Sequence, residues 1–179
     1  MNRSIEISRF SHFFIADTKS SWFWLIVRVY LGWEFLMAGW AKFTSAAWLG
    51  SSAGAGISGF VQGALAKTGG LHPDVQLWYA SFLQTAVEAH PILWSYVITY
   101  GEIAVGLGLI FGCLTGVAAF FGIFMNLNFL LAGTVSVNPI MAFLGIGILL
   151  ARRVSGRVGL DYWVRPLMNK CCKPKNGGQ

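Results

Sequence analysis

The stretch RVYLGWEFLMAGWAKF, residues 28–43, ends an apolar run that begins at Trp22 and is long enough to cross a bilayer. It also carries Arg28, Glu34 and Lys42. A charged side chain at the centre of a bilayer costs roughly 2.5–3.5 kcal/mol on insertion scales. On a helical projection these three side chains share an arc of about 120°. We therefore expect one side of this helix to face the interior of a helical bundle.

The composition and the distribution of charge both indicate a membrane protein. Hydrophobic residues make up 55% of the 179 residues and charged residues only 11%, and the mean hydropathy is +0.60. A soluble domain carries about 25% charged residues. The net charge of +6 comes mainly from the two ends of the chain, which indicates membrane topology and argues against nucleic-acid binding. These basic residues are Arg3, Arg9 and Lys19 at one end, and Arg152, Arg153, Arg157, Arg165, Lys170, Lys173 and Lys175 at the other.

The apolar runs predict an all-α membrane protein, a four-transmembrane-helix bundle formed by residues 1–179 as one domain. The expected spans are about 22–43, 92–112, 116–134 and 135–151, each judged against the roughly 20 residues that cross a bilayer. The outer loop, 44–90, holds Lys67 against Asp74 and Glu88, so its charge is 1 − 2 = −1. The basic ends, including the tail 152–179, are therefore expected in the cytoplasm, in a multi-pass protein of the cell inner membrane.

The outer loop is expected to contain two short amphipathic helices that lie along the outer membrane face. Apolar residues recur there at helical spacing in two segments, the second after the helix-start sequence His72-Pro73-Asp74. The two sets are Ile57, Phe60, Val61, Ala64 and Leu65, and Val75, Trp78, Tyr79, Phe82, Leu83 and Ala86.

Three of the four spans place polar side chains near the middle of the bilayer. Glu34 lies about 12 residues into the first span, and Glu102 and Asn126 each lie about 10 residues into theirs. Two carboxylates that face a basic group can share a proton, which suits a site that binds the head of a quinone or passes protons to it. The candidate catalytic residues are Glu34 and Glu102, and the candidate quinone- or substrate-binding residues are Arg28, Lys42, Asn126, Asn128 and Trp33.

Two other interpretations of these polar residues stay open. Buried Arg–Glu pairs and Asn side chains often only hold helices together and fix their register. A proton relay is the other alternative. No metal or nucleotide motif is expected, because His72, Asp74 and His90 do not have the spacing of a compact site. Cys113, Cys171 and Cys172 form no CxxC pair.

Three blocks of sequence, in this order and spacing, resemble the DoxX/DoxD family of four-span membrane proteins. The first is R-x-x-x-G-W-E-F-L-x-A-G-x-A-K-F, from Arg28 to Phe43. The second is YGEIAVGLGLIFGCLTGVAA, from Tyr100 to Ala119. The third, NPIMAFLGIGILLA from Asn138 to Ala151, is followed by SGRVGLDYW, residues 155–163.

The resemblance implies an integral-membrane subunit of a quinone-linked oxidoreductase. The 44–90 loop resembles the corresponding segment of the DoxD branch of the family. For that branch, the resemblance implies oxidation of thiosulfate outside the membrane, with electrons passed to quinone. The implied partners are the lipid bilayer, quinone, and other membrane-complex subunits or further copies of the chain. The alternative function is a non-catalytic structural or assembly subunit of a larger membrane complex, and a small transporter is the third class considered.

Overall fold

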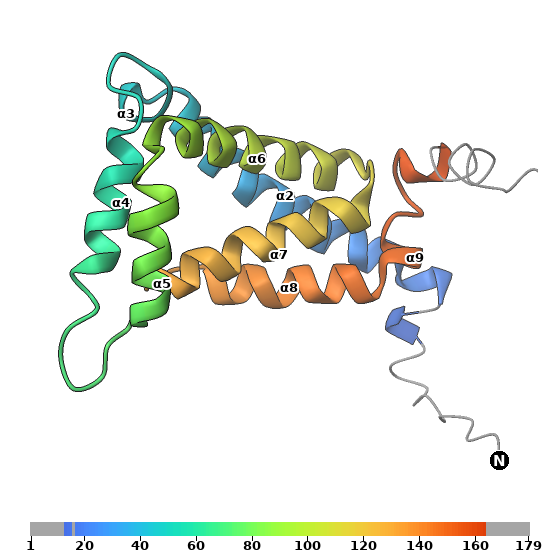
Figure 1. Ribbon diagram of the computed structural model, residues 1–179. Helices are drawn as coiled ribbons and strands as arrows, with labels where there is room; N and C mark the ends of the chain where they lie inside the picture. The colour runs from blue at the N-terminus through green and yellow to red at the C-terminus, as the bar shows by residue number, and fades with distance from the viewer. Residues whose placement is uncertain (1–12, 16, 164–179) are drawn as a thin grey trace, which may run out of the picture.

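The computed structural model describes residues 13–15 and 17–163, and all regular elements within them are helices (Figure 1). The tail beyond Trp163, with Cys171 and Cys172, lies outside the described residues. After a short 3-10 turn, Thr18–Ser20, the helices are α2 (Ser21–Phe43), α3 (Ala46–Leu49), α4 (Ala55–Leu65), α5 (Leu77–Phe82), a π-helical turn (Leu83–Val87), α6 (Pro91–Phe111), α7 (Thr115–Leu131), α8 (Asn138–Leu150) and α9 (Arg152–Ser155).

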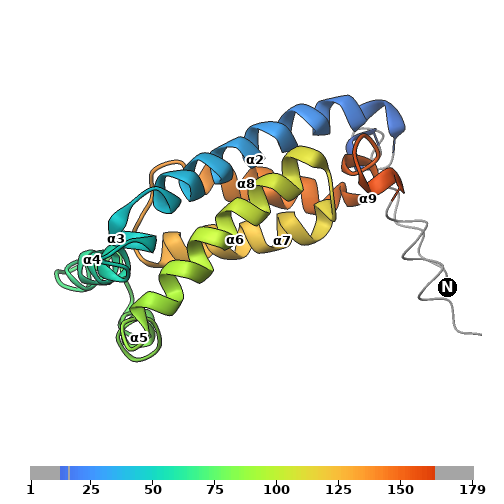
Figure 2. The same ribbon diagram turned by 90° about the horizontal axis from the view of Figure 1, so that it is seen from above.

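The four longest helices, α2, α6, α7 and α8, lie side by side and form a bundle (Figures 1 and 2). Their bounds agree with the four predicted apolar runs, although α8 begins at Asn138 instead of residue 135. By length and composition, α6 is the one described helix that is long and apolar enough to cross a membrane; α7 and α8 are apolar but have 17 and 13 residues.

Glycines set the close packing of α2 against α6. A Cβ atom at Gly106 would lie 2.7 Å from the backbone nitrogen of Leu36, and one at Gly32 would lie 2.8 Å from the carbonyl oxygen of Gly106. A Cβ atom at Gly39 would lie 2.9 Å from the nitrogen of Ile103. The two backbones therefore touch along several turns, as small residues allow in membrane bundles. This contact fixes which residues of α2 and α6 lie at the same depth.

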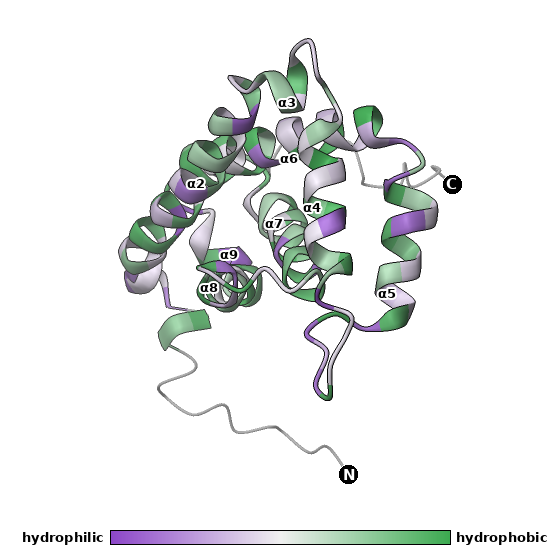
Figure 3. Cartoon of the chain, turned by 90° about the vertical axis from the view of Figure 1, so that its left-hand side faces the viewer, coloured by the Kyte–Doolittle hydropathy of each residue, from purple (hydrophilic) through white to green (hydrophobic). Residues whose placement is uncertain are grey.

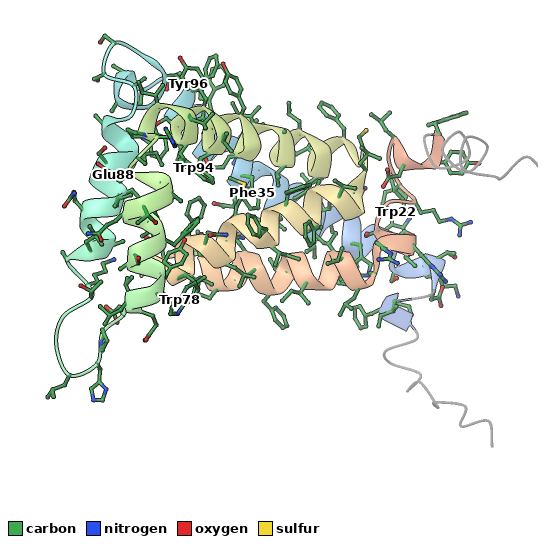
Figure 4. The ribbon with its side chains drawn as sticks, viewed as in Figure 1. Trp22, Phe35, Trp78, Glu88, Trp94 and Tyr96 are labelled. Carbon is green, nitrogen blue, oxygen red and sulfur yellow. The ribbon has the colours of Figure 1, made fainter. Side chains whose placement is uncertain are left out.

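Large apolar side chains cover the outside of the bundle as well as its interior. Figure 3 shows hydrophobic residues around the helices, and Figure 4 shows Tyr96 and Trp78 pointing away from the chain while Phe35 lies inside it. A soluble monomer rarely exposes continuous apolar surface on this scale. The surface suits contact with lipid, and its members on the bundle helices include Ile26, Trp33, Met37, Val97, Leu107, Phe111, Val117, Phe120, Phe121, Phe124, Ile140, Phe143, Ile146 and Leu150.

The predicted helices of the 44–90 loop form a layer across one end of the bundle, which we call the end cap (α3, α4, α5 and the π-helical turn). In Figures 1 and 2, α4 and α5 run across the direction of the long helices. The end cap has a core of its own, to which Ile57, Val61 and Leu83 contribute. The predicted helix start at His72-Pro73-Asp74 is wrong, since α5 begins at Leu77. Val75 packs into the end-cap core in an irregular segment, with its nitrogen bonded to the carbonyl of Lys67.

Candidate functional site

A buried ion pair joins α2 to α6 near the end cap. Lys42 Nζ lies 2.7 Å and 2.9 Å from the two carboxylate oxygens of Glu102. The Glu102 side chain is 2% exposed and that of Lys42 is 20% exposed. The ammonium also lies 5.2 Å from the ring centroid of Trp48, within the range of a cation–π contact. Two of the predicted site residues, Lys42 and Glu102, are therefore in direct contact.

Asn126 lies at about the same depth as this pair. The Cβ position of Gly122, one turn before Asn126, contacts Phe35 and Val105, and Val105 is three residues beyond Glu102 on the antiparallel helix α6. The Asn126 side chain is buried, and neither its oxygen nor its nitrogen has a hydrogen-bond partner among the described residues. The predicted meeting of Asn126 and Glu102 in the bundle interior agrees with this register.

Arg28, a predicted quinone- or substrate-binding residue, lies at the opposite end of α2 and does not pair with Glu34. Its guanidinium is 1% exposed and donates to the carbonyl oxygens of Ser155, at 2.9 Å, and Val158, at 2.6 Å. Glu34 is half-buried and forms no ion pair within the described part of the chain. Arg28 therefore anchors the segment that follows α9.

The same segment also binds the turn between α6 and α7. The Asp161 carboxylate accepts hydrogen bonds from the backbone nitrogens of Leu114, at 2.7 Å, and Thr115, at 3.0 Å. It therefore caps the first turn of α7 from 46 positions further along the chain. The Asp161 nitrogen in turn donates to the carbonyl of Gly112. Arg28 and Asp161 thus close the end of the bundle that is remote from the end cap, which we call the terminal end.

An apolar cavity of about 730 Å³ lies between α6 and α7 and extends beneath α4 and α5. We call it the α6–α7 cavity. Its walls include Gly101, Val105, Val117 and Phe121, and Asn128 is the one predicted site residue that lines it. Glu34, Glu102 and Asn126 are not part of its lining.

The end of the α6–α7 cavity nearest the end cap carries a hydrogen-bonded pair. The Tyr79 hydroxyl lies 3.0 Å from the backbone oxygen of Asn128 and 3.1 Å from its side-chain oxygen. The Asn128 amide nitrogen donates to the carbonyl of Phe124 at 2.8 Å. Burial raises the pKa of Tyr79 to about 12, so the phenol stays protonated at neutral pH. This pair offers polar groups at one end of an otherwise largely apolar space.

The sequence-based site therefore divides into separate parts. Lys42 and Glu102 are in contact and Asn126 is buried at about the same depth, whereas Arg28 lies at the terminal end and Trp33 is exposed on the outside of α2. Sequence reasoning gave no role to Tyr79. Asp161 lies in the SGRVGLDYW block, which was a signal for it, whereas Tyr79 was one apolar position among several in the loop. Within residues 13–15 and 17–163, no three His, Cys, Asp or Glu side chains gather to hold a metal ion.

The lipid-compatible surface, the helical bundle and its buried polar pair define a helical membrane protein. A family model described as DoxX matches residues 23–134, more than half of the chain. The chain therefore belongs to the DoxX family, as the three sequence blocks indicate. The match covers α2, the end cap, α6 and α7. Neither the curated proteins nor the solved structures gave a match to the chain.

Proposed function

We propose that this protein is an integral-membrane subunit of a quinone-linked oxidoreductase, and that the quinone lies in the α6–α7 cavity. The observation that carries the proposal is the cavity itself: about 730 Å³ of apolar space with the Tyr79–Asn128 pair at one end. Ligand sites commonly combine an apolar lining with a few polar groups that orient the ligand. A quinone has the matching chemistry, an isoprenoid tail and a head with carbonyl oxygens.

The free hydrogen-bonding capacity of Asn128 fits a quinone carbonyl. An amide nitrogen has two N–H donors, and the bond to Phe124 uses one of them. The Tyr79 hydroxyl holds the Asn128 oxygen and so fixes the orientation of the amide. The second N–H then remains for a carbonyl oxygen in the cavity, while the apolar walls along α6 and α7 exclude water from the tail.

The membrane topology that we propose is four spans, α2, α6, α7 and α8, with both termini in the cytoplasm and the end cap outside the inner membrane. The apolar surface of all four helices supports it. The helices α2 and α7 are about 35 Å and 26 Å long, comparable with a hydrocarbon core of about 30 Å. The 13 residues of α8 extend only about 20 Å, so the flanking residues 135–137 and Ala151 complete that span in this proposal.

Thiosulfate is the proposed electron donor, following the resemblance to the DoxD branch. When bound, quinone supplies a two-electron, two-proton acceptor for the two electrons released as two thiosulfates join into one tetrathionate. In this proposal the chain positions the quinone through Asn128. The candidate route for protons consists of the Lys42–Glu102 pair and two further predicted residues, Glu34 on α2 and Asn126 on α7.

Filling the α6–α7 cavity tests the proposal. A Cβ atom at Gly101 would meet only the Met125 side chain at 3.6 Å, an ordinary contact, so Gly101→Leu occupies the cavity without forcing the backbones apart. We expect it to weaken binding of a short-chain quinone at least tenfold and to lower thiosulfate-dependent quinone reduction in parallel. Gly63→Leu is the matched control, because no atom lies within 4 Å of its Cβ position.

Asn128→Leu tests the orienting hydrogen bond separately. The Tyr79 hydroxyl keeps the backbone oxygen of residue 128 as its partner, so the end cap stays attached. Loss of one hydrogen bond corresponds to roughly 0.5–1.5 kcal/mol, or about 2- to 12-fold in affinity. Wild-type quinone affinity in both Gly101→Leu and Asn128→Leu would refute the proposed site.

A non-catalytic assembly subunit is the second candidate function. The observation that favours it is that several predicted site residues make internal structural contacts: Arg28 holds backbone carbonyls, and Lys42 and Glu102 bond to each other. This candidate predicts no quinone binding. It also predicts a larger complex after purification in mild detergent, which a mass measurement would detect.

A further inference from the structure

A second hollow lies at the terminal end, between α7, α8 and α9. It has a volume of about 540 Å³ and is lined by apolar side chains of α7, by Leu149 of α8, and by Arg152 and Asp161. We call it the α7–α8 groove. Leu114, Val117 and Phe121 line both this groove and the α6–α7 cavity, so the two adjoin along α7. Figure 1 shows α7 and α8 side by side with α9 following α8 at this end. The groove thus joins an apolar wall on the bundle to a basic side chain at the bundle end.

The apolar wall is a stripe on one face of α7. Val117, Phe120 and Phe121 are three and four residues apart, so they lie on the same side of the helix, and all three are about half exposed. From Leu114 to Phe121 the helix rises about 10 Å. One leaflet contributes about 15 Å, half of the hydrocarbon core. The stripe therefore matches the part of an acyl chain nearest its headgroup.

The basic end of the groove has the charge to hold an anion. Arg152, Arg153 and Arg157 are exposed at the terminal end, and Arg152 lines the groove. A guanidinium has five N–H donors, so it can keep a partner within the protein and still bind a phosphate. Basic pockets between membrane helices on the cytoplasmic side are typical sites for anionic lipid headgroups.

The one acidic side chain in the groove lining does not oppose this. Asp161 is almost completely buried, and its two oxygens accept the backbone hydrogen bonds of Leu114 and Thr115. Its charge also interacts with that of buried Arg28. The accessible charge beside the groove is therefore positive.

We propose that the α7–α8 groove binds one molecule of an anionic glycerophospholipid, phosphatidylglycerol. Its phosphate lies on Arg152, and one acyl chain lies along Val117, Phe120 and Phe121. The proposal rests on the chain being embedded in a membrane and does not depend on quinone binding. A bound lipid at this position would cover the junction of α7, α8 and α9 and help to hold the bundle closed at its terminal end.

Two variants separate the headgroup contact from the acyl-chain contact. Arg152→Gln removes the charge in the groove, and Arg157→Gln, an exposed arginine outside the groove lining, is its matched control. Gly116→Leu fills the groove: a Cβ atom there would meet only the Arg152 side chain at 3.7 Å, and leucine favours a helix more than glycine does. Gly63→Leu is the control for adding a side chain at an open helical position.

The measurement is native mass spectrometry of the full-length protein in detergent, titrated with phosphatidylglycerol or with phosphatidylcholine of the same acyl chains. We expect one phosphatidylglycerol to bind more tightly than phosphatidylcholine. Arg152→Gln should weaken it about fivefold, the effect of one basic side chain on an anionic lipid, and Gly116→Leu at least as much. The two control variants should stay within about twofold of wild type, and a cooperative melting curve in each of the four variants shows that it is folded.

Equal losses of phosphatidylglycerol affinity in Arg152→Gln and Arg157→Gln would overturn the proposal. They would mean that both arginines act only through the overall positive charge of the terminal end. Wild-type affinity in Gly116→Leu would also overturn the proposal. Gly101 lines only the α6–α7 cavity and Gly116 only the α7–α8 groove. Gly101→Leu should therefore leave lipid binding unchanged, and Gly116→Leu should leave quinone binding unchanged. Failure of the lipid site and failure of the quinone site are therefore distinguishable.

Discussion

Replacing Glu102 with Gln removes the charge that holds the Lys42 ammonium inside the bundle. Removing one partner of a buried ion pair costs roughly 3–5 kcal/mol, because the remaining charge is left without compensation. A fifth of the Lys42 side chain is accessible, so it can turn partly toward the end cap. We therefore expect a loss near the lower end of the range, about 3 kcal/mol, for Glu102→Gln.

The reverse change, Lys42→Met, leaves the Glu102 carboxylate buried without its cation, and we expect a similar loss. The double variant Lys42→Met/Glu102→Gln has no uncompensated charge, and replacing a buried pair by uncharged groups of similar size is often close to neutral. The two single losses should thus not add. We expect a coupling energy of about 2–3 kcal/mol between the two positions.

Thermal unfolding of the purified variants in mild detergent measures these differences. At about 2–4 °C per kcal/mol for a chain of this size, each single variant should lower the midpoint by roughly 6–12 °C. Glu34→Gln is the control, since Glu34 is half-buried and has no ion pair in the described part of the chain. Single losses below about 1 kcal/mol, or losses that simply add in the double variant, would refute the reasoning.

Three further predictions concern packing, capping and titration. Gly106→Ala places a Cβ atom 2.7 Å from the nitrogen of Leu36 and should cost about 1–3 kcal/mol, whereas Gly63→Ala should be neutral or stabilising; equal melting points would contradict this. Asp161→Ala removes the acceptor for the first turn of α7 and should lower the unfolding free energy by about 0.5–2 kcal/mol, measured against Asp161→Asn, which keeps one acceptor. The raised pKa of Tyr79 means that its stabilising effect is complete below pH 10 and is lost as the pH rises through about 12. An alkaline absorbance titration should show a tyrosine step near pH 12 that is absent in Tyr79→Phe; retention of that step would contradict the assignment.

The helices could be predicted because their signals are local. Apolar runs of the right length placed the long helices to within a few residues of their bounds. The start of α5 was missed because Val75 is held by the end-cap core before the helix begins, and this contact with a distant segment is not visible in the local sequence.

The partner of Glu102 could not be predicted from depth alone. Counting residues from the span ends put Glu34 at the level of Glu102, but the glycine contacts align Gly39 with Glu102 and Gly32 with Gly106. Glu34 is five residues from Gly39, about 7.5 Å along the axis. The long Lys42 side chain, which points back toward the start of its helix, reaches Glu102 instead. The register came from backbone contacts between glycines, which the charge pattern does not encode.

Photolabelling with an azido-quinone, followed by peptide mass spectrometry, tests most directly whether the α6–α7 cavity holds a quinone. We expect labels on α6, α7 and α5, on peptides within residues 77–129, that unlabelled quinone competes away and that fall at least tenfold in Gly101→Leu. Labels on α2 beside Glu34, or labelling of α6 and α7 that Gly101→Leu leaves unchanged, would contradict the proposed site.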